Sequence, residues 1–270
     1  MSMVGRQMNG LSLHYYTLPT GNWSTKGSAT EFGEDQWFST LSRTLQMDDI
    51  ITKHSAVMDT TDAAKRIGLV VDEWGTWYDV EPGTEPGFLY QQNTLRDALA
   101  AALNFHIFQR HADRVVMANI AQTVNVLQAM ILTDKEKMLR TPTYWVFEMF
   151  KVHQGGTSLP VELQSPDYVF GDQKIPAISA SATRGTDGRT VHLSLANTNP
   201  HQPATIAVTL TGVRPSSVTG RVLTAPTMRA HNSFAAPDAV KPVTLEGARL
   251  SGGTLLVTLP AKSVAVVELR

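Results

Sequence analysis

The periodicity of apolar residues changes once along these 270 residues, near residue 154, and this change constrains the fold more than any other feature. Up to about residue 153, short apolar runs alternate with stretches of helical spacing. From about residue 154 onward, short alternating segments are separated by Gly, Pro and Asn. We therefore expect two regions, 1–153 of α/β type and 154–270 of all-β type.

The first region contains three strand–helix units. Strand-like apolar runs are followed by helical spacing. The runs lie at about 11–16, 67–71 and 114–119, and the helices at about 35–58, 94–110 and 142–153. Such alternation is typical of a parallel sheet with crossover helices. Three units do not close a (β/α)8 barrel, so we expect either an open sheet or the last part of a barrel.

The second region predicts an antiparallel β-sandwich of roughly 110–120 residues, a common size for that architecture. Helical periodicity is absent from it. The clearest expected strands are 191–195, 205–210, 255–259 and 264–269.

Composition excludes several classes of function. The 23 basic and 24 acidic residues nearly cancel, which gives no electrostatic basis for binding nucleic acid or an anionic membrane. The absence of Cys excludes disulfides, thiolate metal sites and a Cys nucleophile. No apolar run reaches 18 residues, and the first ten residues lack the apolar core of a signal peptide. A cytoplasmic location is favoured over secretion.

Polar and aromatic side chains gather at the ends of the three expected strands, where the active sites of parallel α/β barrels lie. The first strand ends in His14 and Tyr16, and the second in Asp72 and Glu73, followed by Trp74 and Trp77. The third is followed by Gln122 and Asn125.

Glu73 is the sharpest candidate for chemistry. A carboxylate at the tip of a buried strand beside tryptophans is expected to be desolvated, and it suits a nucleophile or an acid/base group in glycoside hydrolysis. The alternative is that Glu73 caps a loop or pairs with an Arg. Asp72 is expected to support it by hydrogen bonding, Trp74 to pack, and Trp77 to line a pocket.

Other chemistries find little support in the sequence. His14 lacks a second His at ligand spacing, so no metal site is expected. Two glycine-containing loops lack the Lys of a P-loop, and no GxSxG nucleophile elbow occurs. We expect no cofactor.

Four segments in order carry a resemblance to a known family: 13–16 (LHYY), 71–78 (VDEWGTWY), 111–115 (HADRV) and 118–126 (ANIAQTVNV). Together they resemble the C-terminal portion of a family 51 α-L-arabinofuranosidase. The resemblance is strong over about residues 10–155 and looser through the β-domain.

This resemblance implies a retaining glycosidase on a (β/α)8 barrel with an attached β-sandwich. It implies that Glu73, at the end of the seventh barrel strand, is the nucleophile. Tyr16, ending the sixth strand, would hydrogen-bond that carboxylate, with support from His14. The implied substrate-binding residues are Trp77, Gln122 and Asn125. Family members often carry Asn where this chain has Gly75.

A retaining mechanism also needs a second carboxyl group about 5–5.5 Å from the nucleophile. The family carries it in an Asn-Glu pair, which this sequence lacks, and its loop glutamates are no obvious substitute: Glu31, Glu34, Glu81 and Glu85. We therefore expect the C-terminal part of an enzyme, inactive by itself.

Several alternatives stay open. The chain could be an inactive fragment, a weak sugar-binding module, or part of a glycosidase acting on xylose or glucose units. The expected partner is an arabinose-containing oligosaccharide or polysaccharide, and resemblance implies homo-oligomers, hexamers among full-length relatives.

Overall fold

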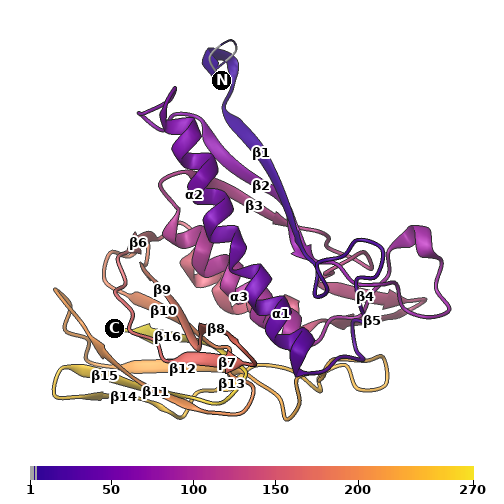
Figure 1. Ribbon diagram of the computed structural model, residues 1–270. Helices are drawn as coiled ribbons and strands as arrows, with labels where there is room; N and C mark the ends of the chain where they lie inside the picture. Colours follow the sequence, from indigo (N-terminus) through magenta and orange to yellow (C-terminus); the bar gives the residue numbers. More distant parts are fainter. Residues whose placement is uncertain (1–2, 4) are drawn as a thin grey trace.

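The computed structural model describes residue 3 and residues 5–270. Residues 1, 2 and 4 lie outside this part, so the expectation that the first ten residues form no signal peptide falls partly outside it. A parallel sheet flanked by helices is joined to an antiparallel β-sandwich that ends the chain (Figure 1). None of the described helices combines the length and apolar character needed to cross a bilayer.

The α/β part is the C-terminal portion of a (β/α)8 barrel, as predicted. Its three strands are parallel, in the order β1-β2-β3. The strands are β1 (Gly10–Thr17), β2 (Gly68–Thr76) and β3 (Val115–Ile120). The helices are α1 (Glu34–Thr44), α2 (Gln46–Asp59), α3 (Leu95–Arg110) and α4 (Pro142–Phe150), with short 3-10 turns η1 (Gly5–Gln7), η2 (Pro86–Phe88) and η3 (Lys151–His153).

The single helix expected over about 35–58 is divided at Leu45 into α1 and α2. Leu45 keeps helical dihedral angles, and its N–H still donates to Leu41 O. Just before it, the hydroxyl of Thr44 donates to Thr40 O, and that of Thr40 donates to Gln36 O. Hydroxyl bonds of this kind compete with the helical ladder and often bend helices, which explains the division.

Helix α3 is buried all round rather than on one face. Its N-terminus is fixed by a capping box, in which the Thr94 side chain accepts from the helix backbone and the Asp97 carboxylate accepts from Thr94 N–H. The expected apolar face, including Leu99 and Leu103, packs in the core, but Ala101 and Asn104 are buried as well. The reason is that α3 lies between the sheet and the sandwich (Figure 1).

The sandwich has one six-stranded sheet and one three-stranded sheet, both antiparallel. Their orders are β13-β12-β16-β10-β9-β6 and β11-β15-β14. The strands are β6 (Thr157–Leu159), β9 (Ile178–Arg184), β10 (Val191–Asn197), β11 (Ala204–Thr209), β12 (Val218–Leu223), β13 (Val243–Thr244), β14 (Ala248–Ser251), β15 (Thr254–Leu259) and β16 (Ser263–Leu269). The four strands expected from alternation coincide with β10, β11, β15 and β16.

Strand β16 divides its side chains between two cores because alternate residues of a strand point to opposite faces. Val264 and Val266 belong to the cluster that contains Trp74 of the barrel part. Ala265 and Val267 belong to the cluster inside the sandwich. The division into 1–153 and 154–270 stays a prediction, since the first core continues across it.

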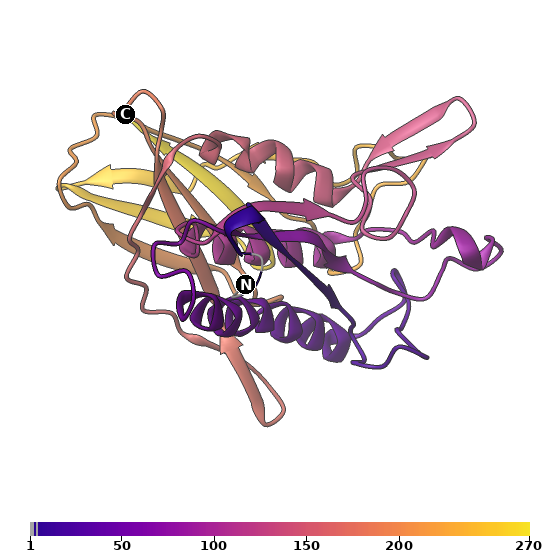
Figure 2. The same ribbon diagram turned by 90° about the horizontal axis from the view of Figure 1, so that it is seen from above.

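Two hairpins were not expected from the sequence. They are β4–β5 (Ile131–Asp134 and Lys137–Arg140) and β7–β8 (Asp167–Phe170 and Gln173–Pro176). From above, they project on opposite sides of the molecule (Figure 2).

Three buried histidines lie between the barrel helices and the sandwich. His106 of α3 has Nδ1 2.8 Å from Ser179 Oγ, and His153 has Nδ1 2.8 Å from Thr183 Oγ1. The ring of His192 on β10 is 6.1 Å from that of His153. Burial, with a smaller contribution from His192, lowers the pKa of His153 to about 4. Burial also lowers the pKa of His106 well below its usual range.

Acidification is therefore expected to destabilise this contact. An unfolded histidine titrates near 6.5 and folded His153 near 4, so between these values the unfolded chain binds more protons. The free energy of unfolding should fall by about 3 kcal/mol from His153 as pH drops through this window. Urea unfolding at pH 7 and pH 4.5 measures the loss.

The matched control is His153→Asn, which keeps a polar partner for Thr183 but does not titrate. This variant should lose less stability between the two pH values than the wild type. Equal losses in the two proteins would contradict the assignment to His153.

Candidate active site

Strand β1 presents three polar side chains on one face because its side chains alternate. Leu11, Leu13 and Tyr15 pack against the helix-covered core. Ser12, His14 and Tyr16 therefore lie on the opposite face of the sheet, which the helices leave open. In a closed barrel this is the inner face.

Strand β2 places Asp72 and Glu73 on that same open face through an extra residue. Between Val71 and Trp74 the strand advances three residues while β3 advances two. Against β1 it gains one residue between Val70 and Glu73. This is a β-bulge, in which two residues oppose one. Leu69, Val71 and Trp74 are fully buried on the helix side, so both carboxylates are left on the other.

The carboxylates, His14 and Tyr16 form one cluster of polar contacts. The Tyr16 hydroxyl donates to Glu73 Oε2 at 2.8 Å. His14 lies between the acids, with Nε2 3.0 Å from Asp72 Oδ1 and Nδ1 3.5 Å from Glu73 Oε2. The Ser12 hydroxyl donates to Asp72 Oδ1 at 2.7 Å. The structure thus brings together His14, Tyr16 and Glu73, which sequence reasoning placed at neighbouring strand ends.

Two groups of the cluster, Tyr16 and Asp72, have shifted pKa values. Burial, and then the hydrogen bond to Glu73, raises the pKa of Tyr16, so the phenol stays protonated and donates. The Ser12 hydrogen bond, with further help from His14, lowers the pKa of Asp72.

The expectation that Glu73 is desolvated is wrong for this chain. Its side chain is 48% exposed. Val71 and Trp74 are buried, whereas Asp72 between them is half-buried and Glu73 is exposed. None of the described residues covers the Glu73 carboxylate closely enough to exclude water. The alternative, in which Glu73 caps a loop or pairs with an Arg, is also wrong, because the partners of Glu73 are Tyr16 and His14.

The two tryptophans near Glu73 have different environments. Trp74 is fully buried against Phe105, Phe108 and Phe147, as the packing interpretation predicted. Trp77 is half-buried and meets Tyr16 edge-on, with ring centroids 5.0 Å apart.

Gln122 and Asn125 lie on the loop that follows β3. Gln122 is exposed, and its backbone N–H donates to Val126 O. The Asn125 amide is engaged within its own loop, donating to Thr133 Oγ1 and accepting from Thr133 N–H, both at 2.7 Å. No hydrogen bond between described residues joins either side chain to Glu73. Their roles in binding substrate stay predictions.

A buried polar network, missed by sequence reasoning, holds the end of β2. Thr76 N–H donates to Gln128 Oε1 at 2.8 Å, and Gln128 Nε2 donates to Asp97 O at 2.9 Å. The Asp97 carboxylate accepts from Thr76 Oγ1 and from the hydroxyl of Tyr78. Nothing in the local sequence marked Gln128, because its partners come from β2 and α3.

Gly75 fits this network by having no side chain. Its φ is +150°, and a Cβ there would lie 3.1 Å from Gln128 Oε1. An Asn at this position would adopt a strained φ and would press against the amide that fixes Thr76.

The other glutamates considered as acid/base groups are engaged elsewhere. Glu34 accepts from the Tyr168 hydroxyl and meets His201, and Glu31 pairs with Arg229. Glu81 accepts from Gln92 N–H, and Glu85 caps η2.

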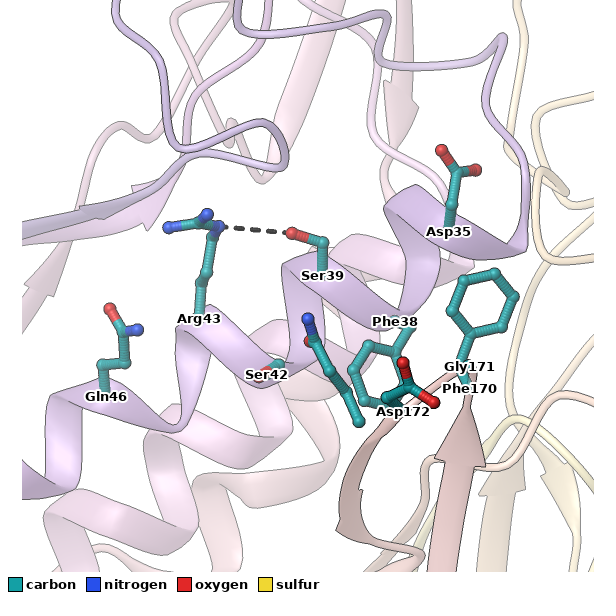
Figure 3. A pocket seen from close by; sticks show the side chains of 10 residues that line it. Asp35, Phe38, Ser39, Ser42, Arg43, Gln46, Phe170, Gly171 and Asp172 are labelled. Carbon is teal, nitrogen blue, oxygen red and sulfur yellow. Dashed lines mark hydrogen bonds between the residues drawn. The ribbon is translucent and has the colours of Figure 1, made fainter.

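One hollow of the structure lies away from this cluster. It has a volume of about 460 Å³ and is formed by α1, Gln46 and the β7–β8 turn (Figure 3). The side chains that line it are polar apart from Phe38 and Phe170. It shares no residue with the strand-end cluster. Among the described residues, no group of three or more His, Asp or Glu is arranged to hold a metal ion.

A parallel βα sheet with a carboxylate, a tyrosine and a histidine at its strand ends, joined to a β-sandwich, is typical of a barrel-type glycosidase. The chain belongs to the α-L-arabinofuranosidase C-terminal domain family, whose sequence profile matches residues 72–263. The resemblance stated from the four segments is thereby confirmed.

Relatives and solved structures agree with this assignment. The chain is 46% identical, over its whole length and 52% of the relative, to an intracellular exo-α-L-arabinofuranosidase of Bacteroides ovatus. It superimposes on the family 51 arabinofuranosidase of Xanthomonas axonopodis with a TM-score of 0.97 and 53% identity, covering all of this chain and 54% of that one. It also superimposes on a family 51 α-L-arabinofuranosidase from Bifidobacterium longum with a TM-score of 0.82 and 27% identity, covering 98% of this chain and 54% of that one. The chain thus spans about half the length of these proteins.

The hydrogen bond from Tyr16 to Glu73 predicts a coupled titration. In Glu73→Gln the phenol of Tyr16 loses an anionic acceptor, so its pKa should fall. Tyrosine ring-carbon NMR across alkaline pH measures the shift, with Tyr16→Phe identifying the signal. An unchanged titration would show that the two groups do not interact in solution.

Proposed function

We propose that this chain supplies the nucleophile half of a retaining α-L-arabinofuranosidase site. The observation that carries the proposal is the contact of Glu73 with Tyr16 and His14 at the ends of adjacent parallel strands. The family membership supports the substrate class.

In this mechanism Glu73 attacks the anomeric carbon of a terminal arabinofuranosyl group and forms a glycosyl-enzyme. The Tyr16 hydroxyl holds the attacking carboxylate in one orientation. His14 and Asp72 fix the other side of the cluster. Water then attacks the same carbon and releases arabinose with retained configuration.

The reaction needs a second carboxyl group to protonate the leaving oxygen and later to activate water. The loop glutamates of this chain are committed to other partners. We propose that the acid/base group comes from outside these 270 residues and that the chain alone does not turn over substrate.

The proposed substrate is a saccharide with terminal α-L-arabinofuranosyl groups, of the arabinan or arabinoxylan type. Trp77 would form part of the wall around the sugar, and Gln122, with Asn125 behind it, would contact hydroxyls. The Bacteroides relative is named intracellular and exo-acting, which supports an exo-acting enzyme inside the cell. Homo-oligomer formation stays a prediction.

A second candidate is a non-catalytic module that binds sugar weakly. The half-exposed Glu73 favours it, because a carboxylate open to water lacks the surroundings of a working nucleophile. A third candidate is a glycosidase with the same mechanism that acts on xylose or glucose units. Rates on aryl glycosides of each sugar distinguish it from an arabinofuranosidase.

The decisive test is Glu73→Ala in a fusion that places the N-terminal portion of the Xanthomonas relative before this chain. Turnover of an aryl α-L-arabinofuranoside should fall at least about 10³-fold. Added azide should restore product, as an arabinosyl azide of inverted configuration, because a small anion occupies the space of the lost carboxylate. Retained activity in Glu73→Ala would remove Glu73 from the role.

The chain assayed without the fusion tests the proposal that the acid/base group lies outside these 270 residues. No turnover is expected from it. Turnover at the rate of the fusion would refute the proposal that a required carboxyl group lies elsewhere.

A further inference from the structure

A second tryptophan extends the aromatic surface that begins beside Glu73. Trp23, on the loop between β1 and α1, meets Trp77 edge-on, with ring centroids 5.4 Å apart and an interplanar angle of 84°. Trp77 in turn meets Tyr16, the partner of Glu73. The three rings therefore form a series that leads outward from the nucleophile, and Trp23 is its outermost member.

Trp23 is 58% exposed, although it is the largest apolar side chain in a polar loop. A single exposed apolar residue needs no explanation. Here, however, it adjoins the candidate active site through Trp77, and Lys26 lies with Nζ 5.6 Å from the Trp77 ring. The Trp77 indole therefore lies beside a cation that can donate hydrogen bonds to a ligand, and the exposed Trp23 adds a flat apolar surface next to it.

The loop that carries Trp23 is held in place by the strand end that carries Trp77. The Asp79 carboxylate accepts from the backbone N–H groups of Lys26 and Gly27, and Asp79 N–H donates to Gly27 O. Within the loop, the Thr20 hydroxyl donates to Thr25 O at 2.5 Å. These bonds join the backbone segments that carry the two tryptophans, and such pre-organisation lowers the entropy cost of binding.

We propose that Trp23 stacks on the second sugar ring of the substrate, the one on the leaving-group side of the bond that is cut. This inference rests on the proposed function. An exo-acting enzyme has only the terminal arabinose on one side of the bond, so any further ring belongs to the leaving group. Trp77 lies beside Tyr16 and the terminal sugar, and Trp23 lies one ring further out, where the next sugar must pass.

The test compares two substrates that differ in whether the leaving group has a ring. They are α-1,5-arabinotriose and α-L-arabinofuranosyl fluoride, both assayed with the Xanthomonas fusion. Trp23→Ala should lower kcat/KM for the trisaccharide about 3- to 10-fold, mainly through KM, since aromatic stacking has a modest energy. The fluoride should change less than about 2-fold. Trp23→Phe should recover most of the loss.

The matched control is Phe88→Ala, which removes another exposed aromatic side chain, on η2. It should leave both substrates unaffected. Equal losses on both substrates in Trp23→Ala, the result expected if another segment of the protein covers this indole, would overturn the inference. So would the absence of loss on either.

A binding measurement decides the matter independently of turnover. In the fusion carrying Glu73→Ala, arabinotriose should shift the indole N–H signal of Trp23, whereas arabinose alone should shift only that of Trp77. A Trp23 signal unmoved by saturating trisaccharide overturns the inference. Failure of the wild-type fusion to cleave either substrate, or full activity in Glu73→Ala, would instead count against the proposed function.

Discussion

One extra residue in β2, between Val71 and Trp74, sets the geometry of the candidate site. Without the bulge, Asp72 and Glu73 would point to opposite faces of the sheet, and one of them would enter the helix-covered core. With it, both acids reach His14, and Trp74 still closes the core. The cluster of acid, imidazole and phenol therefore depends on a local departure from regular strand structure.

The second constraint is the burial of α3 on all sides. The sheet packs against one side of α3 and the sandwich against the other, so Ala101 and Asn104 are buried from solvent as Leu99 is. The same helix begins with the Thr94–Asp97 capping box, and the Asp97 carboxylate also binds Thr76 at the end of β2. Packing of the sandwich against α3 is thus mechanically linked to the strand end that carries Glu73.

Much of this could be predicted from sequence because it depends on local periodicity. Alternation places Ser12, His14 and Tyr16 on one face, and the change near residue 154 marks the sandwich. What could not be predicted depends on contacts between distant segments. The exposure of Glu73 depends on what covers the sheet, and Gln128 acquires its partners only when β2 and α3 meet.

The backbone conformation at Gly75 limits which side chains related sequences can carry at this position. Its positive φ and the 3.1 Å gap to Gln128 Oε1 make the two positions sterically dependent on each other. A protein that gains a side chain at position 75 must shift the Gln128 amide slightly to make room for it. The effect of a substitution at position 75 is therefore expected to depend on how far the side chain at position 128 can shift.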